Sequence, residues 1–359
     1  MEVSIPSVTK TEVAASASIH PIPYGVAMLG APRVWALDKT RGEDEKAAVL
    51  DTGVDGNHPD LNLAGAVDFT GEGPQDDHGH GSHVAGSIGA DGKICGGAPG
   101  VELYSVKVLD GNGQGTYEWI AKGIDWCREN GINIINMSLG GPKPPDNRLY
   151  EAVVRAYNAG INLIVAGGNF GAINVELGDH VNTIMYPADY DQCVAVTAVN
   201  PEKKVPIYSS KGPQAELAFA GDNVLSTWPG GGYMRLSGTS MATGYATAAF
   251  TLMRARRKQR GLPVTPAHLR DAMATFAKDL GVRGRDNAYG YGLFSFGFSV
   301  HIQYQAGNKT FFVNGEPQEA RMAPHIKDDI MWLPIRETAN SYEGSVKYDH
   351  LNKTVDIIR

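Results

Sequence analysis

The order of apolar segments along the first 300 residues constrains the fold of this chain most strongly. Short runs that are apolar almost throughout, such as KAAVLD (46–51), INIINMSL (132–139) and CVAVTAV (193–199), alternate with amphipathic stretches such as YEWIAKGIDWCREN (117–130). Strands of this kind are typical of parallel sheets that are covered by helices on both faces. We therefore predict an α/β fold with a doubly wound, mostly parallel sheet.

The pattern changes after AYGYGLFSF (288–296), and we place a domain boundary near residue 298. Beyond it, short alternating strands surround the turn Asn314-Gly315, and PIRETANSY (334–342) resembles a helix. Residues before the first periodic segment show no regular period. The predicted parts are an N-terminal extension (1–19), a main domain (20–298) and a small α+β domain (299–359).

Composition and charge exclude several classes of partner. The 359 residues have a formal net charge of −7, which disfavours nucleic acid or an anionic membrane as the main partner. No apolar run approaches the ~18–20 residues that span a bilayer, and residues 1–19 lack the basic start and apolar core of a signal peptide. Three widely spaced cysteines fit neither a disulfide framework nor a zinc site.

Asp51 directly follows an apolar run and precedes Thr-Gly. A carboxylate at the carboxyl end of a parallel strand points into the crevice where open α/β sheets bind ligands. An aspartic protease needs two such aspartates facing each other, and the sequence has no second Asp-Thr-Gly or Asp-Ser-Gly. Asp51 is therefore a candidate for a different chemistry.

Three histidines, His78, His80 and His83, lie within six residues. Their spacing resembles the zinc-binding start of a metallo-β-lactamase-type hydrolase, although that family has an Asp where this chain has Ser82. A second interpretation makes His80 a general base at the start of a helix, with its ring oriented by Asp51 and with His83 packed inside. The histidines alone leave both interpretations open.

Ser240 lies in Gly-Thr-Ser-Met, at the start of an apolar segment that predicts a buried helix. The unpaired N–H groups and the dipole at a helix N-terminus favour a developing oxyanion, although an ordinary N-cap is the plainer role for a serine. Asn169 ends the strand-like INLIVAGGN. Its NH₂ group could complete an oxyanion hole with the backbone N–H of Ser240, whereas in isolation it predicts a turn.

Taken together, Asp51 in VLDTG, His80 in HGSHVAG, Asn169 in AGGN and Ser240 in GTSMA resemble the subtilisin-like serine proteases, or subtilases (peptidase S8). The resemblance covers roughly residues 20–298. It implies an endopeptidase of broad specificity that cleaves proteins or peptides through an acyl-enzyme and needs no cofactor for catalysis. Ser240 would be the nucleophile, His80 the general base, Asp51 its orienting partner and Asn169 an oxyanion donor.

The same resemblance implies a groove for the substrate. One segment would pair with the substrate backbone as an added strand, an apolar pocket would lie several residues before the cut, and a second pocket would hold the residue just before the cut. The segment is Ser138, Leu139 and Gly140; Tyr117 and Leu139 would line the first pocket, and Ala166 and Gly168 would flank the second.

Three residues depart from the family. Phe170 stands where a Glu is common, and Met185 stands where a small residue often forms the pocket floor. We predict a shallow apolar pocket that takes small or medium side chains. Gly244 replaces a rigid proline behind the nucleophile, which bears on the position of the nucleophile and so on the rate. Two alternatives stay open: a processing protease for one dedicated partner, with the altered pocket setting its selectivity, and a catalytically weak binding module.

The loop SIGADGKICGG (87–97) is shorter than the calcium-holding loop of the family, and His20 stands where a Gln ligand is common. We therefore expect no calcium at that position. An acidic cluster could still bind a cation through oxygen ligands, although a solvated loop is the plainer interpretation. The cluster consists of Asp68, Glu72, Asp76 and Asp77.

Residues 300–359 resemble the copper amine oxidase N-terminal-like, or stalk, domain of bacterial surface proteins, from FFVNGEPQEA to YDHLNKTVDI. Despite its name, this resemblance implies no copper and suggests contact with the cell surface. Residues 1–19 are either the remnant of a propeptide or an extension of the kind that blocks the cleft in intracellular members. The tail favours secretion and the missing signal sequence disfavours it, so the compartment stays open.

Overall fold

The computed structural model describes residues 2–5, 9–12, 22–178 and 180–297, and seven strands between residues 300 and 358. The chain divides into two compact units, Met1–Ser295 and Phe296–Arg359. Within the described part of the chain, no helix combines the length and the apolar character that crossing a membrane requires.

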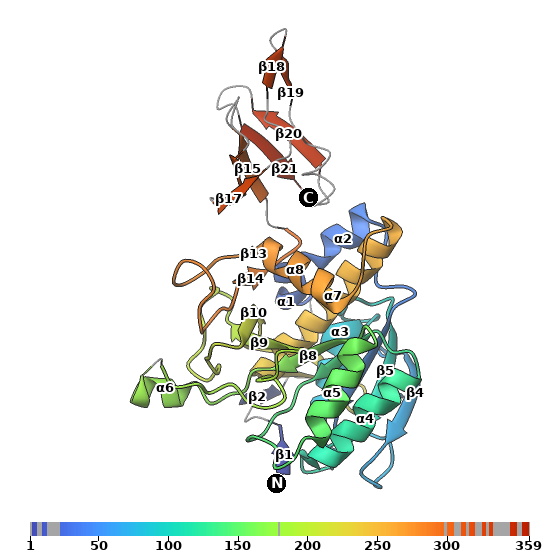
Figure 1. The fold of residues 1–359 in the computed structure, drawn as a ribbon. Coiled ribbons are helices and arrows are strands. Elements are labelled where there is room, and N and C mark those ends of the chain that lie inside the picture. Colours follow the sequence, from blue (N-terminus) through green and yellow to red (C-terminus); the bar gives the residue numbers. More distant parts are fainter. Residues whose placement is uncertain are drawn as a thin grey trace. The chain divides into compact units, whose positions relative to one another are not determined.

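A nine-stranded sheet forms the centre of the first unit (Figure 1), and the predicted doubly wound, mostly parallel α/β fold is confirmed. The strand order is β13-β14-β10-β9-β8-β7-β3-β5-β4, and only the β13–β14 pair is antiparallel. The strands are β3 (Lys46–Asp51), β4 (Leu63–Asp68), β5 (Glu102–Lys107), β7 (Ile134–Met137), β8 (Asn162–Ala166), β9 (Cys193–Val199), β10 (Ala215–Ala220), β13 (Ala277–Lys278) and β14 (Leu293–Phe294).

Helices cover both faces of this sheet (Figure 1). In β3, Ala48 and Leu50 pack into the same apolar cluster as the buried sides of α4 and α5. The alternate residues, Ala47 and Val49, are equally buried on the face where α3 and α7 lie. Burial on both faces explains why these strands are apolar throughout. The helices are α1 (Tyr24–Leu29), α2 (Ala31–Leu37), α3 (His80–Gly89), α4 (Tyr117–Glu129), α5 (Arg148–Asn158), α6 (Ala172–Leu177), α7 (Thr239–Gln259) and α8 (Pro266–Phe276).

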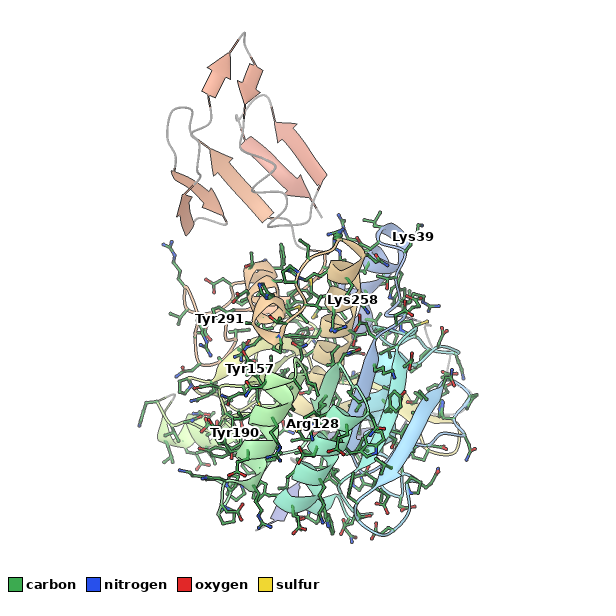
Figure 2. The ribbon with its side chains drawn as sticks, turned by 45° about the vertical axis from the view of Figure 1, so that its right-hand side comes forward. Lys39, Arg128, Tyr157, Tyr190, Lys258 and Tyr291 are labelled. Carbon is green, nitrogen blue, oxygen red and sulfur yellow. The ribbon has the colours of Figure 1, made fainter. Side chains whose placement is uncertain are left out.

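Helix α7 runs from the carboxyl edge of the sheet to its amino edge. Near its end, Lys258 (labelled in Figure 2) places its Nζ 3.0 Å from Oε1 of Glu45. Glu45 is fully buried just before β3, and Arg254 of the same helix also binds it. Because the far end of α7 is held at the start of β3, its N-terminus is directed at the edge where β3 ends.

Two short strands lie in the segment that the sequence analysis interprets as an irregular extension. β1 (Glu2–Ser4) runs antiparallel to β6 (Gln114–Thr116). β2 (Thr9–Glu12) adds to the antiparallel pair of β11 (Val224–Trp228) and β12 (Gly232–Ser237). Both strands obtain their hydrogen bonds from edges of the main unit, so the local sequence needs no strong strand period.

The second unit contains a five-stranded antiparallel sheet and a separate hairpin. Its sheet order is β17-β16-β15-β21-β20. The helix-like stretch 334–342 and the turn at 314–315 lie outside the described residues. The strands are β15 (Val300–Tyr304), β16 (Thr310–Val313), β17 (Glu316–Glu319), β18 (His325–Lys327), β19 (Ile330–Trp332), β20 (Ser345–Asp349) and β21 (Thr354–Ile358).

Candidate active site

The carboxyl ends of three adjacent strands bring the predicted site residues together. Leu50 of β3 pairs with Met137 of β7, and Met137 pairs with Val165 of β8. Asp51 comes directly after Leu50, and Ser138 directly after Met137, so both lie at the same edge of the sheet. The loop that leads from β8 to Asn169 begins at this edge too. This edge is where ligands bind in open α/β sheets.

Asp51 and His80 form a buried pair at this edge. His80 Nδ1 lies 2.8 Å from Asp51 Oδ1, and both side chains are fully inaccessible to solvent. His80 is the first residue of α3. That helix approaches the turn after β3 so closely that a β-carbon on Gly81 would lie 2.0 Å from the carbonyl oxygen of Gly53, and only glycine fits there. Among the residues that the structure describes, none forms a hydrogen bond with His80 Nε2.

Ser240 lies in the first turn of α7 and is fully buried. Its hydroxyl donates to the carbonyl oxygen of Ser138 at 3.2 Å, and the hydroxyl of Ser138 donates back to the carbonyl oxygen of Ser240 at 3.0 Å. These reciprocal bonds fix the start of α7 against the segment after β7. Since Asp51 ends β3 and Ser138 follows the adjacent strand β7, Ser240 and the His–Asp pair lie at the same end of the sheet.

Asn169 is oriented by the residue before Ser240. Its Oδ1 accepts hydrogen bonds from the backbone N–H and the hydroxyl of Thr239, at 2.9 and 3.0 Å. The same hydroxyl accepts from the backbone N–H of Gly168 at 3.2 Å. With the oxygen held by Thr239, the NH₂ group occupies the opposite branch of the amide, as an oxyanion donor requires.

The three histidines do not converge on one point. His83 is fully buried, and its Nε2 lies 3.1 Å from the carbonyl oxygens of both Val224 and Met234. Burial lowers the pKa of His83 to about 3, so this ring is neutral and structural. The ring centroids of His78 and His80 are 6.3 Å apart. Over the described residues, no group of three or more His, Cys, Asp or Glu side chains is arranged to hold a metal ion.

Met185 lies next to Gly140 of the predicted strand-pairing segment and next to Gly168, which was predicted to flank the pocket. A β-carbon on Gly140 would lie 3.0 Å from Met185 Cβ, and one on Gly168 would lie 2.8 Å from Met185 Cγ. The backbone N–H of Met185 donates to Gly167 at 3.0 Å, next to the buried Ala166. Phe170 is 45% exposed, and its backbone N–H donates to Ser210 Oγ at 3.1 Å.

The N-terminal strand β1 lies in the predicted substrate groove, in line with one of the two alternatives for residues 1–19, although its strand pairing was not predicted. Ser4 and Gly140 exchange two backbone hydrogen bonds, at 3.1 and 3.2 Å. Val3 is fully buried in the apolar cluster that contains Tyr117 and Leu139. The only signal in the sequence was the alternation of polar residues with Val3 and Ile5.

The acidic cluster is engaged by donors of the protein itself. Asp76 accepts from the hydroxyls of Thr52 and Ser82, at 2.8 and 2.6 Å. Fully buried Lys107 donates to the carbonyl oxygen of Thr52 at 2.8 Å, and its ammonium lies 3.6 Å from Asp77 and 3.7 Å from Glu72. The fourth member, Asp68, accepts hydrogen bonds from its own turn, residues 70–73.

The short loop 87–97 is also closed by protein contacts. The backbone N–H groups of Lys93 and Ile94 donate to the two carboxylate oxygens of Asp60, at 2.9 and 3.0 Å. The hydroxyl of Tyr233 donates to the same carboxylate at 2.8 Å. Direct hydrogen bonds therefore hold this loop. His20 lies outside the described residues.

Comparison with known proteins identifies the family. The model of the subtilase family matches residues 42–292. The chain is 38% identical to subtilisin DY of Bacillus licheniformis over 265 residues, which are 72% of this chain and 93% of that protein. It is 38% identical to the minor extracellular protease Epr of Bacillus subtilis over 91% of this chain, although it spans only 48% of Epr.

An intracellular serine protease of Paenibacillus polymyxa is 39% identical over 66% of this chain and 74% of its own length. The names of these relatives thus include both extracellular and intracellular enzymes, and all three come from bacteria. The family match covers more than half of the chain and includes the whole carboxyl-edge site. The chain belongs to the subtilase family and is a serine endopeptidase.

Proposed function

We propose that Asp51, His80 and Ser240 form the catalytic triad of this endopeptidase, with Asn169 and the Ser240 backbone N–H as the oxyanion hole. The observation that supports this most strongly is the buried Asp51–His80 pair, in which His80 Nε2 has no hydrogen-bond partner within the described part of the chain. A buried imidazole nitrogen without a hydrogen bond lowers the stability of the folded protein, so its presence calls for an explanation such as a function. Accepting the proton of a serine hydroxyl is such a function.

The proposed reaction proceeds in two displacement steps. The Ser240 hydroxyl leaves its hydrogen bond to Ser138 and attacks the scissile carbonyl carbon, while His80 Nε2 takes the hydroxyl proton. The C–N bond then breaks, and His80 returns the proton to the leaving amine. Water repeats the sequence on the acyl-enzyme. The negative charge of Asp51 stabilises the imidazolium in both steps, and these steps need no metal or organic cofactor.

We further propose that substrates bind as an added strand, so that their backbone gives most of the affinity. β1 supports this proposal, because it lies antiparallel to β6 and exchanges hydrogen bonds with Gly140. Val3 exemplifies a side chain that fits the Tyr117–Leu139 pocket. Met185 restricts the pocket next to the cut to small or medium side chains. A dedicated processing protease would use the same groove with stricter pockets.

The occupied groove also bears on the role of the extension. We propose that residues 2–5 act as a substrate-like inhibitor, so that full activity requires their displacement. For the second unit we propose an accessory role in contact with the cell surface, on the resemblance of residues 300–359 alone.

The first test compares Ser240→Ala with the wild type on a peptide that has Ala before the cut. Ser105→Ala is the matched control, because Ser105 is also a buried serine and its hydroxyl binds none of the described residues. In subtilisin, a member of the same family, loss of the nucleophile lowers kcat by about 10⁶-fold, and we expect a loss on this scale. Activity of Ser240→Ala equal to that of Ser105→Ala would refute the proposed triad.

A further inference from the structure

Helix α7 contains a row of four buried threonines on one face: Thr239, Thr243, Thr247 and Thr251. They follow one another at intervals of four residues, so they lie one turn apart. The hydroxyls of Thr243 and Thr251 each donate to the carbonyl oxygen four residues before, at 2.7 and 2.9 Å, and the Thr247 hydroxyl lies 2.9 Å from the carbonyl oxygen of Thr243. Such bonds weaken a helix slightly, which makes a row of them unexpected in a core.

Two members of this threonine row bind polar side chains of the site. Thr239 holds Asn169, as described above. Two turns later, Thr247 Oγ1 lies 2.9 Å from Asn136 Oδ1. Thr251, by contrast, bonds only within its own helix as far as the described residues show.

Asn136 is connected to Ser240, the proposed nucleophile, by hydrogen bonds through Ser138. It lies in β7, and its Nδ2 donates to Ser138 Oγ at 3.0 Å. Ser138 is the residue that exchanges hydrogen bonds with Ser240 in both directions. In this orientation of the amide, Asn136 Oδ1 accepts the single hydroxyl proton of Thr247, and Nδ2 donates to Ser138. The hydroxyl of Ser138 can then donate to the carbonyl oxygen of Ser240. All four side chains are fully buried, so no water replaces a lost partner.

We propose that Thr247 is a positioning residue for the nucleophile, acting through Asn136 and Ser138. This inference rests on the proposed role of Ser240. With Thr247 in place, the Asn136 amide is fixed and holds Ser138 through a hydrogen bond. Ser138 in turn fixes the first turn of α7 and the resting rotamer of Ser240. When the hydroxyl of Thr247 is removed, the Asn136 amide loses a hydrogen-bond partner and rotates towards another one. Ser138 then loses the hydrogen bond donated by Asn136, and the Ser240 side chain samples a wider range of positions.

The expected signature is a fall in kcat with little change in KM. Displacement of a reacting group by a fraction of an ångström to 1 Å lowers the rate by about 10–100-fold. Binding changes less, because the strand contact observed in the groove is made by the backbone of Gly140. His80 and Asp51 are untouched, so the pH dependence of kcat/KM keeps its shape.

The experiment measures kcat and KM for Thr247→Val, Thr247→Ser and Thr251→Val. Thr247→Val keeps the shape but removes the hydroxyl, and we expect kcat about 10-fold lower with KM within about twofold. Thr247→Ser restores the hydroxyl and should recover kcat. Thr251→Val removes the same kind of helical hydrogen bond without the link to Asn136 and should match the wild type. Equal kcat values for Thr247→Val and Thr251→Val would overturn the proposal.

A double variant separates positioning from stability. Asn136→Leu with Thr247→Val replaces both polar partners by apolar groups, so no buried amide is left unsatisfied and folding should recover. Positioning predicts that kcat stays low in this variant, whereas recovery of the wild-type kcat would overturn it. If Ser240→Ala retained activity in the same assay, the proposed triad would fail instead, and the two failures are thus distinguishable.

Discussion

At the scale of single residues, one side chain decides the predicted selectivity. Met185 lies against both Gly140 and Gly168, so in the proposed pocket it would take up volume that a substrate side chain could otherwise fill. Backbone hydrogen bonds from Met185 to Gly167 and between Tyr186 and Gly141 hold residues 185–186 against the segments that contain Gly140 and Gly168. Residues 169–184, which include the helix α6, separate Met185 from Gly168 in sequence. The family resemblance predicted that Met185 lies at the pocket floor, but local patterns therefore could not show these contacts.

Replacing Met185 by Gly should open the pocket. We expect kcat/KM for peptides with Phe before the cut to rise about 10–100-fold, because a pocket distinguishes apolar groups by their size to this extent. Peptides with Ala at that position are the control and should change little. Steady-state kinetics on the matched pair measures this, and an unchanged Phe/Ala ratio would contradict the assigned pocket.

At the scale of elements, the strand β1 and the helix α7 have opposite roles at the site. α7 positions Ser240 from within the core, with its far end held by Glu45. β1 lies in the groove through a few backbone hydrogen bonds and one buried side chain, Val3. An element with so few contacts opens at low free-energy cost, which suits a reversible inhibitor.

Val3→Asp should release this strand, because an ionised carboxylate is strongly disfavoured in an apolar pocket. We expect the initial rate of peptide hydrolysis to increase about 10-fold or more, as the fraction of enzyme with an open groove grows. Thr11→Asp is the control, because it adds the same charge to the exposed side of β2. If both variants hydrolyse peptide at the wild-type rate, β1 does not limit access.

At the scale of the whole molecule, the sequence predicted the sheet and the family because both depend on local patterns. Strands buried on both faces read as apolar runs, and Asp51, His80, Asn169 and Ser240 each stand in a short motif. The rest depends on contacts between distant segments. The pairing of β1 with β6 and the bond between Thr247 and Asn136, 111 residues apart, leave no local signature. Local patterns therefore could not show how β1 pairs within the groove or which residues support Ser240.

The measurement that tests the central claim most directly is the site of covalent labelling by a serine-directed phosphonate. After the intact protein is treated, peptide mass spectrometry locates the adduct. An activated hydroxyl beside a free imidazole nitrogen predicts one adduct, on Ser240, which is absent in His80→Ala. An adduct on another serine, or none on an enzyme that still cleaves peptides, would contradict the account.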